Sequence, residues 1–163
     1  MRALGLDPGT ATTGYGVVDG DANRLRHVAH GVISTAAGDH FATRLKLIYD
    51  EARGLLRVYR PDIVVLERIY FKQNVTTGIA VAQARGVLAL AAVEAGLPVT
   101  EYSPTETKTA IVGYGRAEKR QVQDMIKILL NLDAPPRPDD AADALALAIC
   151  QVQAGALQGR FRE

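Results

Sequence analysis

The sequence predicts an α/β fold in which a mixed five-stranded sheet, three antiparallel strands and then parallel strands, carries helices on both faces. Three strand-like segments separated by turn residues open the chain, which is typical of an antiparallel meander. Strands and helices then alternate, and each strand-helix-strand crossover requires parallel pairing. The 163 residues contain no repeat or linker, so we expect one domain over residues 1–155 and a flexible tail over residues 156–163.

The first element is an apolar strand that ends on a carboxylate. Pro8 cannot donate to a strand ladder and Gly9 supplies turn geometry, so Asp7 is the last residue of this strand and lies at its mouth. Asp7 can cap the turn or belong to a site, and other carboxylates must decide between these roles. Two further strands follow, separated by the turn-rich segment "DGDAN": residues 14–18 and 26–35.

The segment 41–59 has the period of a helix. Its apolar residues recur at steps of 4, 3, 4 and 3, which places them on one buried face. After Pro61, the β-branched run "DIVVLE" is typical of a strand that is covered on both faces. This fourth strand ends on Glu67, which is either a solvated strand end or a second carboxylate of a site.

The second half of the chain is mostly helical. The alanine-rich segment 76–96 is helical, and "LPVTEY" is the fifth strand. Ser103 can cap a short helix that has Pro104 in its first position. The segment "AEKRQVQDMIKILLNL" forms an amphipathic helix, which "APPRP" ends. The last helix covers residues 139–155, and its body "ALALAIC" is apolar nearly all round, so we expect it to be packed within the fold.

Composition limits the class of protein. The net charge of +1 neither requires nor forbids a nucleic-acid partner, because an acidic site can cancel a basic surface. The single cysteine, Cys150, excludes a disulfide framework and a cysteine-built metal site, and we expect it to be a core residue. No apolar stretch of about 18 residues is free of a charge or glycine, so we expect a soluble cytoplasmic protein without a membrane partner.

Carboxylates gather where this fold forms its sites. In open α/β sheets, sites form at the carboxyl ends of the strands, where Asp7 and Glu67 lie. Asp139, Asp140 and Asp143 open the last helix and share one of its faces. Acids in a first turn also stabilise the helix dipole, which is the alternative explanation. The apolar body of this helix nevertheless implies that its acidic end is held against the sheet.

Carboxylates forced together repel one another unless cations neutralise them. Oxygen ligands without histidine or cysteine select Mg²⁺ or Mn²⁺. Two such ions about 3.5 to 4 Å apart can activate a water and stabilise the leaving oxygen of a phosphodiester. These carboxylates therefore predict a metal site with Mg²⁺ as its cofactor, two ions per site and Mn²⁺ as a substitute, which can act on a phosphodiester.

Helix geometry alone does not decide whether Asp139 or Asp140 binds the metal together with Asp143. At about 100° per residue, Asp139 and Asp140 both lie near Asp143 around the helix. Asp139 follows Pro138 directly and is the better N-cap, with its carboxylate turned onto backbone N–H groups. Capping therefore favours Asp140 as the ligand.

Taken together, these segments resemble the RuvC family of Holliday-junction resolvases, within the ribonuclease H-like superfamily, over about residues 2–153. The matching segments are "GLDPGT", "GYGVV", "LER" with "QN" downstream, "QARGV", "VGYGRAEKRQVQ" and "DDAADALALAI". The resemblance implies that Asp7, Glu67, Asp140 and Asp143 are the catalytic, metal-binding acids. It also implies a homodimer that makes two symmetric nicks in a four-way DNA junction during recombination and repair, working with the RuvA and RuvB branch-migration complex.

DNA binding requires cations and stacking groups near the acids. Tyr70 and Phe71 follow the Glu67 strand and are either core residues or a wedge at the junction centre, for which the resemblance favours Tyr70. Among the cations, Lys108 and Lys119 match basic residues that the family places near the scissile phosphate. The predicted phosphate-binding cations, each of which alone also suits a solvated surface, are Arg68, Lys72, Arg85, Lys108, Arg116, Lys119 and Arg120.

Three other functions compete with this one. A strand followed by Asp-x-Gly-Thr also opens the actin-like ATPase fold, but that fold needs two such lobes and the chain has one such turn. A binding module that lacks catalysis is disfavoured because all four acid positions are filled. A related ribonuclease H-like nuclease that acts on RNA or on simple duplexes is the third alternative.

Overall fold

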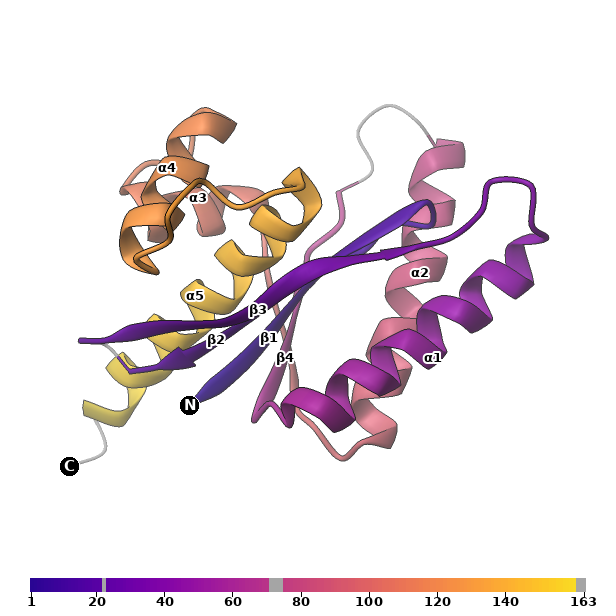
Figure 1. Ribbon diagram of the computed structural model, residues 1–163, viewed down its shortest axis with the longest axis horizontal. Helices are drawn as coiled ribbons and strands as arrows, with labels where there is room; N and C mark the ends of the chain where they lie inside the picture. Colours follow the sequence, from indigo (N-terminus) through magenta and orange to yellow (C-terminus); the bar gives the residue numbers. More distant parts are fainter. Residues whose placement is uncertain (22, 71–74, 161–163) are drawn as a thin grey trace.

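The computed structural model describes residues 1–21, 23–70 and 75–160, with side chains described as far as residue 155. Within these ranges strands and helices follow one another in the order that the sequence predicts (Figure 1). The elements are β1 (Arg2–Asp7), β2 (Thr12–Gly20), β3 (Leu25–Ser34), α1 (Phe41–Tyr59), β4 (Ile63–Glu67), α2 (Val75–Glu94), β5 (Val99–Tyr102), α3 (Pro104–Val112), α4 (Lys119–Leu129) and α5 (Asp139–Arg160).

The strands form one mixed sheet in the order β3-β2-β1-β4-β5. Strands β1, β2 and β3 pair antiparallel, whereas β1 with β4 and β4 with β5 pair parallel. This confirms the predicted mixed sheet. In the parallel pair Leu6 lies opposite Leu66, so β1 and β4 end side by side.

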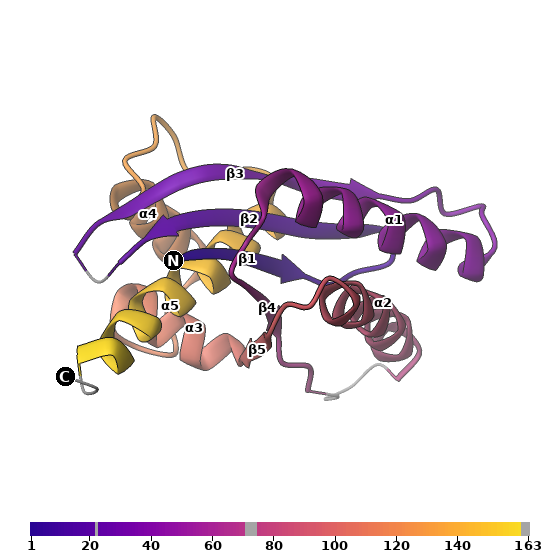
Figure 2. The same cartoon turned by 90° about the horizontal axis from the view of Figure 1, so that it is seen from below.

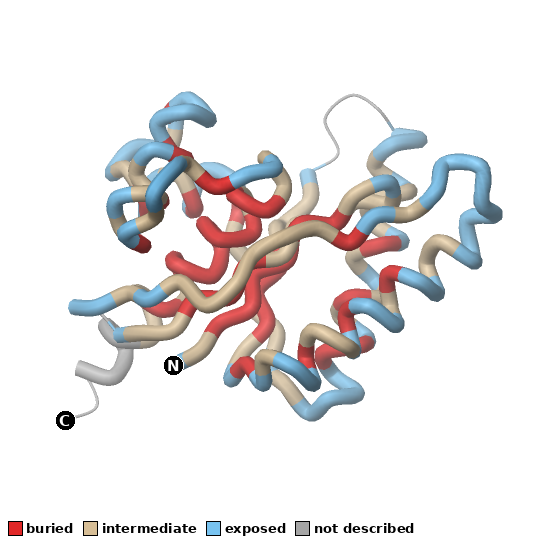
Figure 3. Tube along the Cα trace, in the orientation of Figure 1, coloured by how far each residue is buried: buried red, intermediate tan, exposed pale blue. Residues whose placement is uncertain are grey.

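Helices cover both faces of the sheet, as predicted. Figures 1 and 2 show α1 and α2 on one face and α5 on the other, with α3 and α4 packed on α5. Successive residues of β1 serve the two cores, because side chains alternate across a strand. Ala3 packs in the core with α5, and Leu4 packs in the core with α1 and α2. Figure 3 shows the buried residues concentrated in the sheet and along α5.

Helix α5 is buried along most of its described length. Its residues from Ala144 to Cys150 are at most 3% exposed, which confirms the prediction that this apolar helix is packed within the fold. Burial raises the pKa of the Cys150 thiol to about 12. Cys150 is therefore a core residue, as expected. The described helix runs on to Arg160, and the flexible tail over residues 156–163 stays a prediction.

The cap of α3 follows the sequence prediction. The Ser103 hydroxyl accepts a hydrogen bond from the backbone N–H of Glu106 at 3.1 Å, and the Glu106 carboxylate accepts one from the Ser103 N–H at 2.7 Å. Pro104 occupies the first helical position. This reciprocal capping box fixes the start of α3 directly after β5.

Helix α2 is the one helix in the described part of the chain that is long and apolar enough to cross a membrane by length and composition. The sequence prediction had excluded such a segment because charges and glycines interrupt it. Core helices of soluble proteins meet the same criterion. Only 22% of the apolar window in α2 is buried by the described residues, and Val75, Ile79, Leu90 and Val93 are exposed on it.

Candidate metal centre

The acidic site begins at the parallel ends of β1 and β4, which place Asp7 beside Glu67. The turn after Asp7 is held by Thr13, a fully buried residue. Its hydroxyl donates to the Gly9 carbonyl at 2.7 Å and accepts from the Gly9 N–H at 3.4 Å. Because Thr13 holds this turn, the Asp7 carboxylate is left to face the site.

Glycines in β1 and β2 let α5 approach the sheet closely enough to complete the site. A Cβ atom on Gly14 would lie 1.9 Å from the carbonyl oxygen of Asp140, and one on Gly16 would lie 2.6 Å from the backbone nitrogen of Leu145. Such distances are impossible for real atoms, so only glycine fits there. The segment "GYGVV" therefore has a packing role that the sequence analysis did not identify.

Gly14→Ala is expected to push the first turn of α5 away from the sheet. Overpacking of this kind typically costs about 1 to 3 kcal/mol, and the backbone contact leaves no flexible side chain to yield. We expect a lower melting temperature and weaker cleavage. Gly54→Ala in α1, where a Cβ meets no atom within 4 Å, is the matched control and should not lower the melting temperature. Equal behaviour of the two variants would contradict the packing role.

Three aspartates form the centre of the site. Asp7, Asp140 and Asp143 each offer an oxygen, and these oxygens all lie within 4.8 Å of one another, a grouping found among the described residues. Glu67 lies beside this group without belonging to it, and its charge acts on Asp7. The fold thus brings together the strand and helix acids that lie far apart in the sequence.

The electrostatics of the group are those of crowded carboxylates. Burial, together with the charges of Glu67, Asp143 and Asp140, raises the pKa of Asp7 to about 8. Burial and the charge of Asp143 raise the pKa of Glu67, and burial also raises the pKa of Asp143. Without a cation these groups resist ionisation, so the site favours any cation that neutralises them.

The donor set fits a hard divalent cation. The three grouped aspartates are half-buried, and the metal-binding group found among the described residues includes neither histidine nor cysteine. Oxygen-only sites of this kind suit Mg²⁺ and Mn²⁺. The raised pKa values of Asp7, Glu67 and Asp143 add a second reason, because a bound cation would favour the ionised carboxylates that burial and mutual repulsion disfavour.

Two lysines lie at the edge of the acidic group. Lys119 Nζ is 3.0 Å from Asp143 Oδ2, and its charge lowers the pKa of Asp143, opposing the effect of burial. Lys108 and Lys119 line a cavity of about 220 Å³ together with Glu67 and Asp143. Both lysines that the resemblance singled out therefore lie beside the acids.

Asp139 lies outside the three-aspartate group, but the predicted reason was wrong. The helix start is closed by the Pro138 carbonyl, which accepts from the N–H groups of Ala141 and Ala142. The Asp139 carboxylate instead accepts hydrogen bonds from Gln123 at 2.9 Å and from Arg137 at 3.2 Å. The hydrogen bond from Gln123, aided by the Lys119 charge, lowers the pKa of Asp139. Hydrogen bonds to other side chains, and not backbone capping, turn this side chain away.

The remaining predicted DNA-binding residues lie in several places. Tyr70 is 57% exposed and lines a cavity of about 590 Å³ that borders Glu67. Arg116 is exposed in the turn before α4, and Arg120 lies 3.9 Å from Asp124 one helical turn further on. Phe71 and Lys72 lie outside the described residues.

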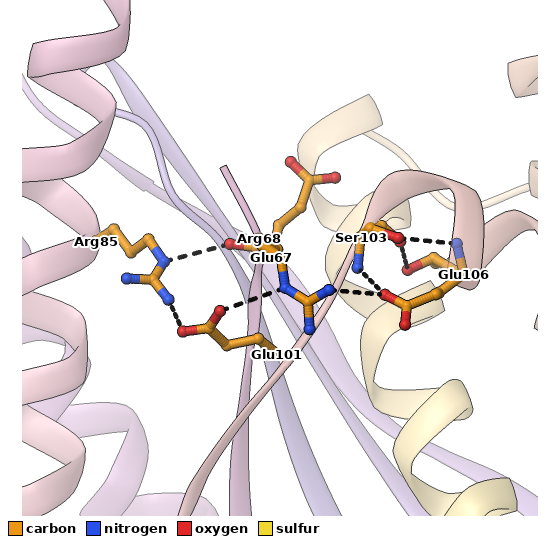
Figure 4. Close-up of polar contacts among 7 residues, drawn as sticks. Glu67, Arg68, Arg85, Glu101, Ser103 and Glu106 are labelled. Carbon is orange, nitrogen blue, oxygen red and sulfur yellow. Dashed lines mark hydrogen bonds and ion pairs between the residues drawn. The ribbon is translucent and has the colours of Figure 1, made fainter. Parts of the chain in front are cut away.

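Arg68 and Arg85 lie against carboxylates of the same chain. Glu101 on β5 lies between the two arginines, and Arg68 also lies 3.5 Å from Glu106 (Figure 4). Sequence patterns single out neither Glu101 nor the pairing of Glu106 with Arg68, which Glu106 makes in addition to capping α3. The available signal was the position of Glu101 beside the end of a parallel strand, where sites form.

Comparison with known proteins agrees with this geometry. The family model described as "Crossover junction endodeoxyribonuclease RuvC" matches residues 3–151. Curated proteins with the same description include one from Brevibacillus brevis, 52% identical over 153 residues that cover 94% of this chain and 92% of the relative. Another, from Chloroflexus aggregans, is 49% identical over 161 residues that cover 99% of this chain and 98% of the relative.

Solved structures agree as well. The RuvC of T. thermophilus in complex with a Holliday junction substrate is 32% identical, superposes with a TM-score of 0.92, and the match covers 97% of this chain and 96% of that one. The yeast mitochondrial Holliday junction resolvase Ydc2 shares the fold, with a TM-score of 0.72 at 16% identity, over 98% of this chain and 81% of that one. By family model, by sequence identity over nearly its whole length and by fold, the chain belongs to the RuvC family of crossover junction endodeoxyribonucleases.

Proposed function

We propose that this chain resolves four-way DNA junctions by paired, symmetric nicks, through Mg²⁺-dependent hydrolysis of phosphodiester bonds that leaves a 5′ phosphate. The observation that carries the proposal is the group formed by Asp7, Asp140 and Asp143, whose oxygens lie within 4.8 Å of one another at the carboxyl edge of the sheet. The similarity to the T. thermophilus protein that was solved with a junction supports the substrate.

In this proposal Asp7, Glu67, Asp140 and Asp143 hold two Mg²⁺ ions, for which Mn²⁺ substitutes. Bound there, such ions would supply charge stabilisation at the phosphate and a nucleophilic water at neutral pH. The protein holds the acids on rigid strand and helix ends, which keeps their geometry fixed. Lys108 and Lys119 bring positive charge to the same cavity, where a scissile phosphate can be bound.

The test compares cleavage of a four-way junction, a linear duplex and an RNA–DNA hybrid, each with and without Mg²⁺. We expect two nicks at symmetry-related positions of the junction, little cleavage of the duplex, and none without a divalent cation. Faster cleavage of the hybrid would favour the alternative nuclease of the same superfamily and contradict the proposed substrate.

We propose that Tyr70 stacks on a base at the open centre of the junction. Its ring is exposed beside the cavity that borders Glu67, where a base has access to it. Stacking is worth about 1 to 3 kcal/mol per base, so Tyr70→Ala should slow cleavage about 5- to 150-fold while weakening junction binding less. Tyr70→Phe keeps the ring and is the matched control. Single-turnover cleavage is measured for each variant. If Phe71→Ala has a larger effect than Tyr70→Ala, then Phe71 is the stacking residue.

We propose a homodimer formed through α2. Six of the exposed residues of this helix recur at steps of 4, 4, 3, 4 and 3 and so form one stripe. Four of them are large apolar residues that are at least 52% exposed. At Gly86 an added Cβ would meet no atom within 4 Å, so a second helix can come close there. The stripe consists of Val75, Ile79, Gln83, Gly86, Leu90 and Val93.

Leu90→Glu is expected to make the protein monomeric, because it places a charge in the middle of this stripe. Light scattering at micromolar concentration checks the mass, and the junction assay should then yield single nicks in place of paired ones. Val58→Glu on α1, at a valine that is 71% exposed, is the control and should leave the mass unchanged. A wild-type monomer would contradict the proposed dimer.

The cellular setting follows from the family. We propose that the protein acts in the cytoplasm, in recombination and repair, on junctions that the RuvA and RuvB complex moves along DNA. Membership of the RuvC family supports this setting. Co-purification of RuvA and RuvB with the protein on a four-way junction, and not on linear duplex, would test the partnership.

A further inference from the structure

A polar network lies directly behind Glu67. Arg85, on α2, donates from Nε to the backbone carbonyl oxygen of Glu67 at 3.3 Å and from Nη2 to the Glu101 carboxylate. Figure 4 shows Arg85 reaching both acceptors from the side of α2, with the Glu67 side chain extending away from the arginine. One side chain of α2 thus bridges the ends of two parallel strands.

The network continues across the sheet edge to α3. The second oxygen of Glu101 lies 3.7 Å from Arg68 Nε, and Arg68 Nη1 lies 3.5 Å from Glu106 Oε2. The same Glu106 oxygen accepts from the Ser103 N–H in the capping box of α3. Four elements, α2, β4, β5 and α3, are therefore connected around the last residue of β4.

The charges of this network balance. Two arginines, Arg68 and Arg85, lie against two carboxylates, Glu101 and Glu106. The Arg85 side chain is only 25% exposed, and its donors are directed at groups of its own chain. The network therefore has little net positive charge. Arg85 is for this reason less suited to the phosphate contact that the sequence predicts.

The position of the bond to Glu67 suggests a different role. Strand β4 ends at Glu67, and the chain leaves the sheet within the next few residues. The carbonyl that Arg85 holds and the carboxylate at the acidic site belong to the same residue, so fixing the main chain fixes where the side chain starts. Outer contacts of this kind orient metal-binding residues, and their loss typically costs 10- to 100-fold in metal affinity or activity.

We propose that Arg85 is a positioning residue, which holds the main chain at Glu67 in register with the aspartates and ties it to α2, with Glu101 as its counter-ion. The inference rests on the proposed function, because it assigns Glu67 to the metal centre. It also connects that centre to the helix proposed as the dimer interface. Arg85 touches neither substrate nor metal in this role.

Arg85→Lys is the most informative variant. Lysine keeps the charge, but all its donors lie on one nitrogen at the end of a flexible chain, so it cannot reproduce the planar fork by which Nε and Nη2 of Arg85 reach the Glu67 carbonyl and Glu101. We expect Arg85→Lys and Arg85→Gln to cut a saturating four-way junction about 10- to 100-fold more slowly, with a higher Mg²⁺ concentration for half-maximal rate. Glu101→Gln should have the same effect in weaker form. Arg57→Gln, at an exposed arginine of α1 outside the network, is the control.

Two measurements separate positioning from phosphate binding and from simple loss of structure. The rise in melting temperature on adding Mg²⁺ reports metal affinity without cleavage, and it should shrink in the Arg85 variants. Junction affinity and its dependence on salt should stay at the wild-type values, because a lost phosphate contact would reduce the salt slope by about 1.

The outcomes are distinct. Wild-type cleavage together with a wild-type Mg²⁺ shift in folded Arg85→Lys and Arg85→Gln would overturn the proposal. Full activity of Arg85→Lys, with a smaller salt slope for Arg85→Gln, would overturn it in favour of a phosphate contact. If Arg85→Gln does not fold, Arg85→Lys and Glu101→Gln decide. If the wild-type protein cuts no junction, the proposed function fails, and the Mg²⁺ shift still tests the positioning role.

Discussion

Asp7→Asn is expected to abolish junction cleavage and leave junction binding close to the wild-type affinity. Asparagine has nearly the same shape, but it cannot carry the negative charge that the proposed divalent cation requires at the centre of the group. Losing that cation removes several kcal/mol of transition-state stabilisation, and about 4 kcal/mol corresponds to a rate about 1,000-fold lower. Single-turnover cleavage and gel-shift binding, measured on one junction, check both halves of the expectation.

The same variant should change stability in the absence of metal. The pKa of Asp7 rises from its ordinary 3.8 to about 8 in the folded chain, so ionising this group opposes folding. Its contribution to stability is complete below pH 4 and is lost as the pH rises through 8. Asp7→Asn removes this dependence and should therefore melt higher than wild type near pH 8, with little difference at pH 4. Mg²⁺ should reduce the difference by stabilising only the wild type.

Two results would contradict a metal-ligand role for Asp7. One is a variant that cuts junctions but binds them poorly, because that pattern belongs to a substrate contact. The other is an equal Mg²⁺-induced rise in melting temperature for Asp7→Asn and the wild type. Asp50→Asn, at an exposed residue of α1 that pairs with Lys46 on its own helix, is the control.

Asp140→Asn and Asp143→Asn are each expected to remove nearly all Mg²⁺-dependent cleavage, whereas Asp139→Asn should stay close to wild type. The first two residues offer oxygens within 4.8 Å of the Asp7 oxygen. Asp139 faces Gln123 and Arg137, and an asparagine oxygen can accept the same two hydrogen bonds. Its ion pair with Lys119 at 3.5 Å is half exposed, and exposed pairs contribute about 0 to 1 kcal/mol.

The comparison of the three variants tests the register of the site. Metal-dependent cleavage of the junction is measured for each variant at the same protein concentration, with melting curves to show that each is folded. If Asp139→Asn is inactive and Asp140→Asn is active, the site is offset by one residue on α5. Loss of activity in all three would instead indicate that Lys119 needs both of its partners.

The order and type of the helices and strands could be predicted because each depends on a pattern of neighbouring residues. The helical period over residues 41–59 and the β-branched run before Glu67 each require only neighbouring residues, and both elements formed where predicted. The meander and the two parallel crossovers followed from connection rules. Asp7 and Glu67 were recognisable as possible site residues because each ends a strand.

Contacts between residues far apart in the sequence could not be predicted from local patterns. Asp139 was expected to cap its own helix, but its partner Gln123 lies 16 positions away on α4. Arg85, which the sequence predicts at DNA, donates to the main chain of Glu67, 18 positions away, a contact that no local pattern indicates. In each case the partner lies far away in the sequence, and only the packed fold brings the two residues together.

By itself the sequence determined the α/β fold class, the positions of the four acids and the family, because each depends on motifs of a few residues in a fixed order. The tertiary structure decided how these acids meet. Gly14 and Gly16 let the main chain of α5 approach β2 at a distance that any Cβ would prevent, and this approach brings Asp140 and Asp143 to Asp7. Burial in that contact, which no linear pattern records, is what raises the pKa of Asp7 and gives the site its preference for a cation.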